Sequence, residues 1–196
     1  MILHDISKGI FSSQVYPDDP EPSARVIKSI PNGDDYNLSE ITLCPHTGTH
    51  IDAPLHFIDN GTPVNKLRLR NFYGKCTVVS VEGDLTGQDM DEILPYCHKR
   101  VLFKGNGKAF LTTTAVEILI DHNVKLVGTD ANTIGSDFDN NKTHKLLLEN
   151  GIPILECLNL SKIEDGDYEI CAFPLKIEAV EASPCRAVLL EQEKGI

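Results

Sequence analysis

The stretch RVLFKGNGKAFLTTTAVEILIDHNVKLVGTD, residues 100–130, decides the fold class because two apolar runs in it flank a helical pattern. RVLFK (100–104) and KLVGTD (125–130) have the composition of buried strands. TTTAVEILIDH (112–122) has the apolar spacing of a helix, and GNGK before it is typical of a turn. A strand, a helix and a strand in this order predict that the two strands pair in parallel.

The same alternation continues on both sides of that stretch. CTVVSV (76–81) precedes it as a further strand, and THKLLLEN (143–150) and IPILE (152–156) follow it as a helix and a strand. Thr114 and Glu117 fit a capping box at the start of the first helix. A β-α-β-α-β order predicts an α/β fold.

The two ends of the chain are richer in strand patterns than in helix patterns. Residues 1–6 are a strand candidate, and residues 24–30 and 36–43 predict a hairpin whose turn is PNGDD. Residues 168–191 contain three strand-like pieces, which Pro174 and a turn at Ser183 and Pro184 are expected to separate.

Composition limits the possible partners. The 196 residues are 41% hydrophobic and carry a formal net charge of -11, so we expect one domain, residues 1–196, that binds a small solute. Nucleic acids and anionic membranes are excluded because they require clustered Lys and Arg. No apolar run approaches the roughly 20 residues that span a bilayer. The six cysteines lack metal-binding or redox spacing, so a cytoplasmic protein with reduced thiols is expected.

Three of the seven histidines share the segment HTGTHIDAPLH, which also contains an aspartate: His46, His50, Asp52 and His56. Gly48, the β-branched residues and the proline oppose a helix, so the segment is predicted to be extended. Side chains two apart in extended backbone face the same way, and His50 and Asp52 can therefore point at one ion. Imidazole and carboxylate groups are the ligands of zinc and manganese.

Two further ligand candidates lie far away in the sequence. His144 is placed near the start of the second predicted helix, and Glu156 ends an apolar strand, where a charged group needs a partner. Cys44 and Cys157 lie close to these candidates and could line the site, and Asp130 could orient a ligand from behind. No GxSxG elbow or phosphate-binding loop is present, which disfavours serine nucleophile chemistry.

HTGTHIDAPLH resembles the signature HxGTHxDxPxH of the cyclase family of metal-dependent hydrolases, whose best-known bacterial activity is that of an arylformamidase. The resemblance extends over most of the chain, through HDIS (4–7), Tyr16 and Pro17, GTD (128–130), HKLLLENGIPILECLNL (144–160) and FPLKIEAVEASPCRAVL (173–189).

The resemblance implies that His46, His50 and Asp52 hold one divalent metal and that His144 and Glu156 complete a second site. Asp52 and Glu156 are then candidates to bridge two ions in each subunit, zinc or alternatively manganese. His56 is implied to be the proton shuttle. The resemblance also implies a swivelling β/β/α fold with a mixed central sheet, and a homodimer or homotetramer with active sites near subunit contacts.

The family's formamidases commonly have tryptophan before the proline in the N-terminal loop, and this chain has Tyr16 there and no tryptophan. Tyrosine can still stack on an aryl ring. One hypothesis is therefore hydrolysis of an aryl formamide such as N-formylkynurenine to kynurenine and formate. A second is hydrolysis of a cyclic amide or another small acyl compound. A third is a non-enzymatic metal-binding relative, which the retention of His56 disfavours.

Overall fold

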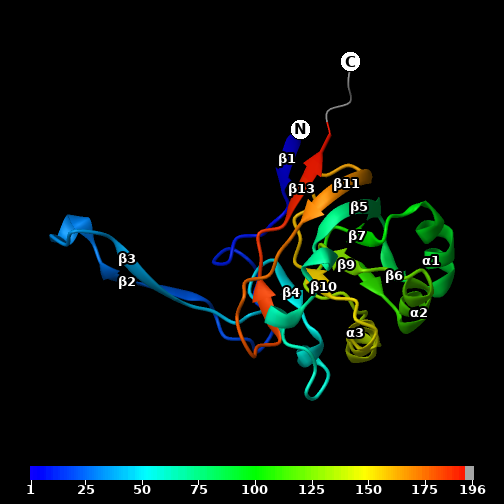
Figure 1. Ribbon diagram of the computed structural model, residues 1–196, viewed down its shortest axis with the longest axis horizontal. Coiled ribbons are helices and arrows are strands. Elements are labelled where there is room, and N and C mark those ends of the chain that lie inside the picture. The colour runs from blue at the N-terminus through cyan, green and yellow to red at the C-terminus, as the bar shows by residue number, and fades with distance from the viewer. Residues whose placement is uncertain (193–196) are drawn as a thin grey trace.

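The computed structural model describes residues 1–192, which form a nine-stranded sheet with three α-helices on one of its faces (Figure 1). The strands of the large sheet lie in the order β1 (Ile2–Asp5), β13 (Val188–Glu191), β11 (Gly166–Cys171), β5 (Tyr73–Ser80), β7 (Arg100–Lys104), β9 (Leu126–Thr129), β10 (Ile154–Glu156), β4 (His50–Asp52) and β12 (Ala182–Pro184).

The strands predicted from the β-α-β-α-β pattern form the centre of this sheet. β5, β7, β9 and β10 pair in parallel, as expected. The outer strands pair antiparallel: β11, β13 and β1 on one side, β4 and β12 on the other. The α/β prediction with a mixed central sheet is therefore confirmed, and the antiparallel half brings β4 beside β10.

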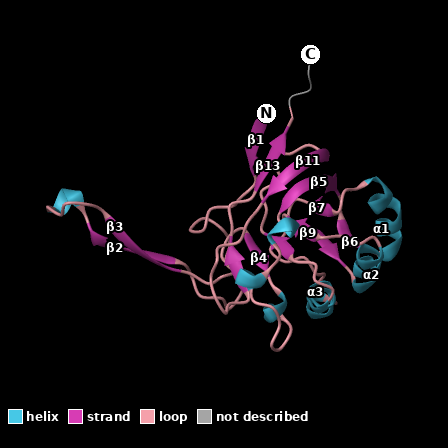
Figure 2. Cartoon of the chain, viewed as in Figure 1, coloured by secondary structure: helices cyan, strands magenta, loops and turns pink. Residues whose placement is uncertain are grey.

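Three helices cover one face of the sheet, namely α1 (Gly87–Ile93), α2 (Thr113–Asp121) and α3 (Asn140–Glu149) (Figure 2). Alternate residues of each strand point to opposite faces. In β7, Val101 and Phe103 pack among the buried residues beneath the helices, whereas Leu102 packs in the second apolar cluster on the other face. Both faces of the central strands are thus buried.

The helix starts differ from the sequence predictions. The N-cap of α2 is Thr112, whose hydroxyl accepts the N–H of Ala115, so the predicted capping box at Thr114 and Glu117 is wrong. The hydroxyl of Thr114 instead accepts the N–H of Gly87 at the start of α1, a short helix that the sequence pattern did not predict. Thr114 thus stabilises a neighbouring element.

The predicted turn at Ser183 and Pro184 is also wrong, because both residues belong to the edge strand β12. Pro184 has no N–H to donate, which an edge strand tolerates. β12 pairs with β4 in a register that places Ala182 opposite Asp52 and Pro184 opposite His50. This pairing ties the C-terminal segment to the histidine-rich strand.

The predicted hairpin is confirmed as β2 (Ser23–Lys28) and β3 (Leu38–Thr42), and it extends away from the rest of the protein (Figure 1). Nearly every residue of the two strands is exposed. Gly33 turns the chain at the tip with a left-handed φ of 93°.

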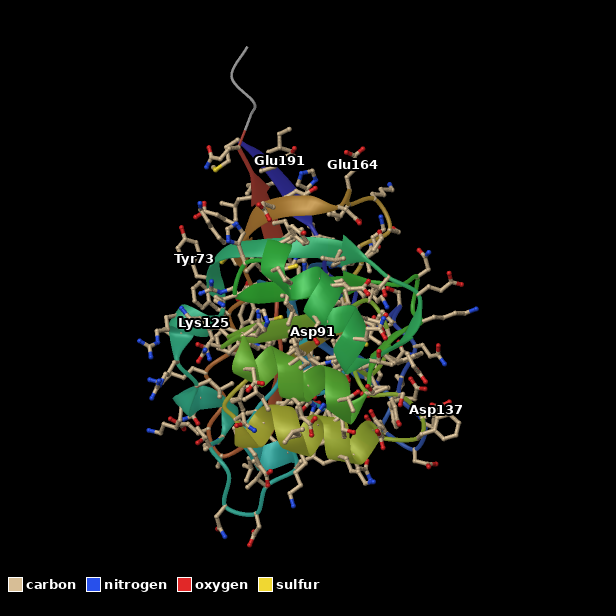
Figure 3. All side chains as sticks on the ribbon, turned by 90° about the vertical axis from the view of Figure 1, so that its right-hand side faces the viewer. Tyr73, Asp91, Lys125, Asp137, Glu164 and Glu191 are labelled. Atoms are coloured by element: carbon tan, nitrogen blue, oxygen red, sulfur yellow. The ribbon has the colours of Figure 1, made fainter. Side chains whose placement is uncertain are left out.

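The remaining elements are short. β6 (Gly83–Leu85) and β8 (Ala109–Leu111) form a second, parallel pair. The 3₁₀ helices are η1 (Ile30–Asn32), η2 (Pro54–His56), η3 (Val64–Lys66), η4 (Leu69–Asn71) and η5 (Leu94–Tyr96). Figure 3 shows Asp137 and Glu164 on the outer surface, where much of the charge lies. Helices in the described part of the chain lack the length and apolar character needed to cross a membrane.

Candidate metal centre

The candidate ligands are arranged around β4, which is buried between β10 and β12. His50 lies opposite Glu156 in the antiparallel pair with β10. Opposed side chains share a face of the sheet, and so do side chains two apart on one strand, so His50, Asp52 and Glu156 project together. His50 Nε2 lies 3.4 Å from Asp52 Oδ1 and 3.5 Å from Glu156 Oε2.

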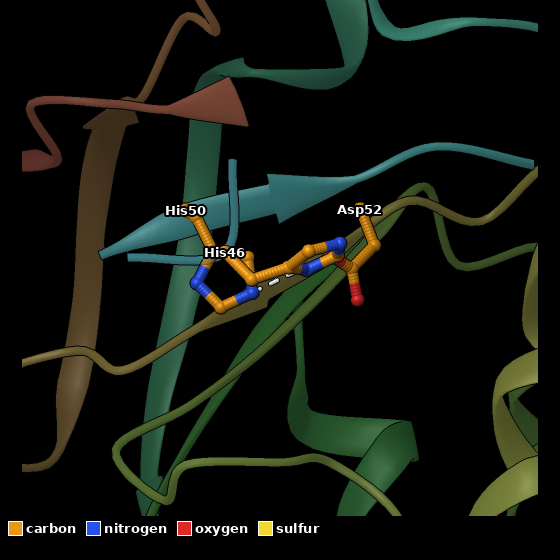
Figure 4. A group of neighbouring side chains, drawn as sticks. All are labelled: His46, His50 and Asp52. Carbon is orange, nitrogen blue, oxygen red and sulfur yellow. Dashed lines mark ion pairs between the residues drawn. The ribbon is translucent and has the colours of Figure 1, made fainter. Parts of the chain in front are cut away.

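His46 reaches the same point from the loop that precedes β4. Gly48 bends this loop with a left-handed φ of 67°, a conformation that costs glycine little. The bend places His46 Nδ1 3.0 Å from Asp52 Oδ1, and Figure 4 shows the side chains of His46, His50 and Asp52 converging.

His144 approaches from the opposite side, on α3. This helix begins at Asn140, ahead of the predicted start at Thr143, which places His144 in its second turn. His144 Nε2 lies 3.1 Å from Glu156 Oε1 and 3.9 Å from Asp52 Oδ2. The structure therefore brings residues from β4, its preceding loop, β10 and α3 to one location.

Asp52 lies between two groups of potential ligands. His46, His50 and Asp52 form one group, and Asp52, His144 and Glu156 form the other, with the ligand atoms of each group within 4.8 Å of one another. Oδ1 of Asp52 faces His46 and His50, whereas Oδ2 faces His144. One carboxylate oxygen is thus available to each group.

Burial and opposite charges compete in setting the protonation of this cluster. Burial raises the pKa of Asp52, but the imidazoles of His46 and His50 outweigh it and hold that pKa well below its ordinary value. Burial and the charge of Asp52 raise the pKa of Glu156, yet His144 and His50 bring it below normal. Burial lowers the pKa of His50 and of His144, but the adjacent carboxylates raise both above normal. The carboxylates therefore stay ionised.

Backbone carbonyls set the tautomers of two histidines. His50 Nδ1 lies 2.8 Å from the carbonyl oxygen of Gly48, and His144 Nδ1 lies 2.8 Å from that of Asn140. A carbonyl oxygen can only accept, so each Nδ1 carries the hydrogen and each Nε2 of a neutral ring presents a lone pair. Each Nε2 faces a carboxylate oxygen, and the raised pKa of both rings shows that a positive charge, either a proton on Nε2 or a metal ion bound to it, is favoured there.

Several buried polar atoms of the cluster have no hydrogen-bond partner within residues 1–192: His46 Nε2, His50 Nε2 and both carboxylate oxygens of Asp52. Unpartnered buried polar atoms are rare in folded proteins because each one loses its hydration. The donor set consists of imidazole nitrogens and carboxylate oxygens, which suits a divalent metal. The residues present therefore fit a metal, and ligation explains why His50 Nε2 and the two Asp52 oxygens lack other partners.

His56 lies beside the two groups and belongs to neither. It is the last residue of η2, and its ring centroid is 4.3 Å from that of His46 and 6.2 Å from that of His144. Burial lowers the pKa of His56, the neighbouring imidazoles of His46 and His144 lower it further, and the carboxylates of Asp52 and Glu156 oppose them without reversing the shift. A neutral imidazole next to the metal groups can accept a proton.

A cavity of about 220 Å³ opens onto the cluster. Tyr16, from the N-terminal loop, and Phe57, the residue after η2, both line this cavity. Sequence reasoning missed the polar residues that complete the wall, because uncharged polar side chains in loops and at a helix start give no motif: Gln14, Asn132, Thr133, Asn140 and Asn141.

The three accessory candidates have different environments. Cys157 lines the cavity and adopts a left-handed φ of 57°, whereas Cys44 donates its thiol hydrogen to Asp19 Oδ2 at 3.7 Å. The carboxylate of Asp130 accepts three backbone N–H groups from residues 105–107 and so holds that turn. The structure therefore shows Asp130 holding the turn at residues 105–107, whereas the sequence suggested that it orients a metal ligand.

Two buried ligand groups that share one carboxylate, with a neutral histidine and an open cavity beside them, define a metal-dependent hydrolase centre. The chain belongs to the cyclase family, which its sequence matches over residues 4–136. It is 34% identical to a kynurenine formamidase from Delftia acidovorans over 201 aligned residues, which cover 95% of this chain and 96% of that protein.

Solved structures confirm the β/β/α fold. A potential metal-dependent hydrolase with cyclase activity superposes with a TM-score of 0.84, at 29% identity and 98% coverage of each chain. Isatin hydrolase A from Labrenzia aggregata, solved with benzyl benzoate, has the same fold with a TM-score of 0.81, at 21% identity, covering 97% of this chain and 94% of that one. The chain is accordingly a metal-dependent hydrolase that acts on carbon–nitrogen bonds other than peptide bonds.

Proposed function

We propose that the protein hydrolyses an aryl formamide, with N-formylkynurenine as the specific candidate, to the free aryl amine and formate. The observation that carries this proposal is the cavity, which brings both ligand groups, His56 and two aromatic rings, Tyr16 and Phe57, to one place. The 34% identity to a kynurenine formamidase, over 95% of this chain, supports the choice of an aryl formamide as substrate.

The ligand groups are proposed to hold two divalent ions in each subunit, with zinc as the metal and manganese as the alternative. His46 and His50 would hold one ion and His144 and Glu156 the other, while Asp52 serves both. When bound, a divalent ion polarises a carbonyl group and lowers the pKa of a water molecule to about 7.

His56 is proposed to transfer the proton. An imidazole nitrogen of His56 accepts a proton from the water as the water oxygen bonds to the amide carbon. The carbon–nitrogen bond then breaks, and His56 returns the proton to the nitrogen of the leaving amine. One water and one amide thus yield one acid and one amine, and His56 returns to its neutral form.

The cavity wall is proposed to orient the substrate. Tyr16 and Phe57 present aromatic rings, on which an aryl group can pack in offset or edge-to-face geometry. Asn132 and Asn140 supply amide groups that can hydrogen-bond to polar substituents. The wall thus combines two aromatic rings with many polar groups, which can fix the orientation of a small molecule.

A substrate panel tests the proposal. Formanilides and N-formylkynurenine are measured against alkyl formamides and cyclic amides with the same metal-loaded enzyme. We expect the aryl formamides to have the highest kcat/KM. A preference for cyclic amides would replace the proposal with the second hypothesis, which the presence of Tyr16 in place of tryptophan keeps open.

The protein is also proposed to form a homodimer or homotetramer, in which the β2–β3 hairpin packs on another copy of this chain. Opposed residues of a hairpin share a face, so Ala24, Val26 and Ile41 form an uncharged face, while Arg25 and Glu40 pair at 2.8 Å on the other. Val26 is 68% exposed and Ile41 is 56% exposed. An isolated two-stranded hairpin is marginally stable, and a second copy is the one partner that is always present.

The reaction is proposed to take place in the cytoplasm. The six cysteines are free, and free thiols persist in a reducing compartment.

A further inference from the structure

His46 has one ring nitrogen toward the ligand group and one turned away from it. Nδ1 lies 3.0 Å from Asp52 Oδ1. Nε2 is buried and has no hydrogen-bond partner in the described part of the chain, and Glu181 Oε1 lies 3.5 Å from it. A buried ring nitrogen beside a carboxylate oxygen needs only a small movement to become a hydrogen-bond donor.

The backbone holds Glu181 in this place. Ala53, the residue after β4, donates its N–H to the carbonyl oxygen of Glu181 at 2.8 Å. The next residue, Ala182, begins β12 and lies opposite Asp52. The segment that carries Glu181 is therefore fixed directly to the strand that carries the ligands, although the two are far apart in the sequence.

We propose that Glu181 is a positioning residue for His46. Its carboxylate accepts the Nε2 hydrogen, which fixes the tautomer that leaves a lone pair on Nδ1 toward the metal. The present separation exceeds an ordinary N–H···O distance by about 0.6 Å, which rotation of either side chain can close. A carboxylate in this position also raises the basicity of a histidine ligand.

His46 differs in this respect from the other two histidine ligands. His50 and His144 are each oriented by a backbone carbonyl, which no substitution of a side chain removes. The orienting group of His46 is a side chain, with 35% of its surface exposed, and it can be changed without altering the ligands. The sequence gives no sign of this role because Glu181 lies outside the histidine-rich motif.

The inference rests on the proposed metal site, and metal affinity tests it. We would measure zinc binding by competition with a chelator for the wild type, Glu181→Ala and Glu181→Gln, with Glu178→Ala as the matched control. Glu178 is an exposed carboxylate three residues away. Loss of an orienting carboxylate should weaken metal binding by about 10- to 100-fold. Glu181→Gln should weaken binding less, because its amide oxygen can still accept, and Glu178→Ala should match the wild type.

The cobalt-substituted protein gives a second readout, since visible absorption of Co²⁺ reports the geometry of its ligands. Glu181→Ala should change this spectrum and Glu178→Ala should not. Unchanged affinity and spectrum in Glu181→Ala, or equal weakening in the alanine and glutamine variants, would overturn the inference. If Glu181→Ala does not fold, Glu181→Asp replaces it. The shorter side chain keeps the negative charge but moves it away from His46, so this variant should bind metal more weakly. Wild-type affinity in Glu181→Asp would also overturn the inference. Failure of the wild type to bind metal would instead refute the metal site itself.

Discussion

β4 and the β2–β3 hairpin are neighbours in the sequence and have opposite environments. All three residues of β4 are buried between two strands, and two of them are charged or titratable. The hairpin strands carry apolar residues that are largely exposed. The buried polar groups of β4 require partners of opposite charge, because burying an unpaired charge lowers the stability of the fold. In the hairpin, a substitution is expected to affect the folded subunit little and the proposed contact with a second copy of the chain strongly.

This contrast predicts that Asp52→Asn has the largest effect on activity. Asp52 belongs to both ligand groups, so its loss should empty both and reduce turnover to background. That loss exceeds the about 10²- to 10⁴-fold expected for a proton-transfer residue. Elemental analysis and kcat/KM of the purified variant check the prediction.

Asp91→Asn, on the exposed surface of α1, is the matched control and should retain full metal content. Full metal occupancy in Asp52→Asn would show that metal binding does not require the shared carboxylate.

His56→Asn is expected to have the next largest effect. The variant should keep its metal, because His56 belongs to neither ligand group, and should lose about 10²- to 10⁴-fold in kcat/KM. His98→Asn is the control, since the ring of His98 lies 3.4 Å from Asp167 and does not line the cavity. Metal loss in His56→Asn comparable to that in Asp52→Asn would show that His56 is a ligand.

The pH profile sharpens this assignment. The pKa of His56 is lowered by burial and by the neighbouring imidazoles, and the proposed reaction requires the neutral form of His56. Activity should therefore persist at pH 6.5 and fall only as pH decreases further, through the lowered pKa. Metal content measured at each pH shows whether the fall in activity at low pH comes from protonation of His56 or from loss of the metal. An activity limb above pH 6.5 that disappears in His56→Asn would contradict the direction of the shift.

The local pattern of the sequence explains why the sheet's centre was predictable. β7, α2, β9 and β10 are each encoded by a continuous apolar pattern, so their order and parallel pairing could be inferred. α1 was missed because it has only seven residues and begins with Gly87. The pairing of β4 with β12 joins segments more than 120 residues apart, and no local pattern specifies such a contact.

The candidate site was predictable where residue chemistry is concentrated. The histidine-rich motif contains four of its members, His46, His50, Asp52 and His56, and the sequence pattern also indicated His144 and Glu156 as candidates. Glu181 and the amides of the cavity wall could not be found, because a polar residue outside a motif shows its role only when the fold places it beside the site. The roles of the predicted residues stay predictions until metal and activity are measured.

Tyr16→Ala should have a smaller effect, confined to substrate recognition. An aromatic contact is worth about 1 kcal/mol, which corresponds to roughly a fivefold loss in kcat/KM for aryl formamides. Tyr16→Trp should move preference toward N-formylkynurenine. Metal content and folding should not change in either variant. If both variants treat the whole substrate panel as the wild type does, Tyr16 serves only to pack its loop.

Val26→Asp, on the uncharged face of the hairpin, should have the smallest effect on the metal site. The change should lower the oligomeric state measured by light scattering, while metal content per subunit stays the same. Subunit stability should change by no more than about 0.5 kcal/mol, as for other exposed positions. Thr42→Asp, on the charged face, is the control. If Val26→Asp has the same oligomeric state as the wild type, the uncharged face of the hairpin does not take part in assembly.

Metal content is the most direct test of the central claim that β4 and its neighbours form a divalent metal centre. The protein is purified without added chelator, analysed for metals, stripped with a chelator and reloaded with zinc or manganese, with hydrolysis of an aryl formamide followed at each step. The account predicts about two ions per subunit, loss of activity on stripping and recovery on reloading. Full activity in the stripped protein, or no metal bound and no activity after reloading, would contradict it.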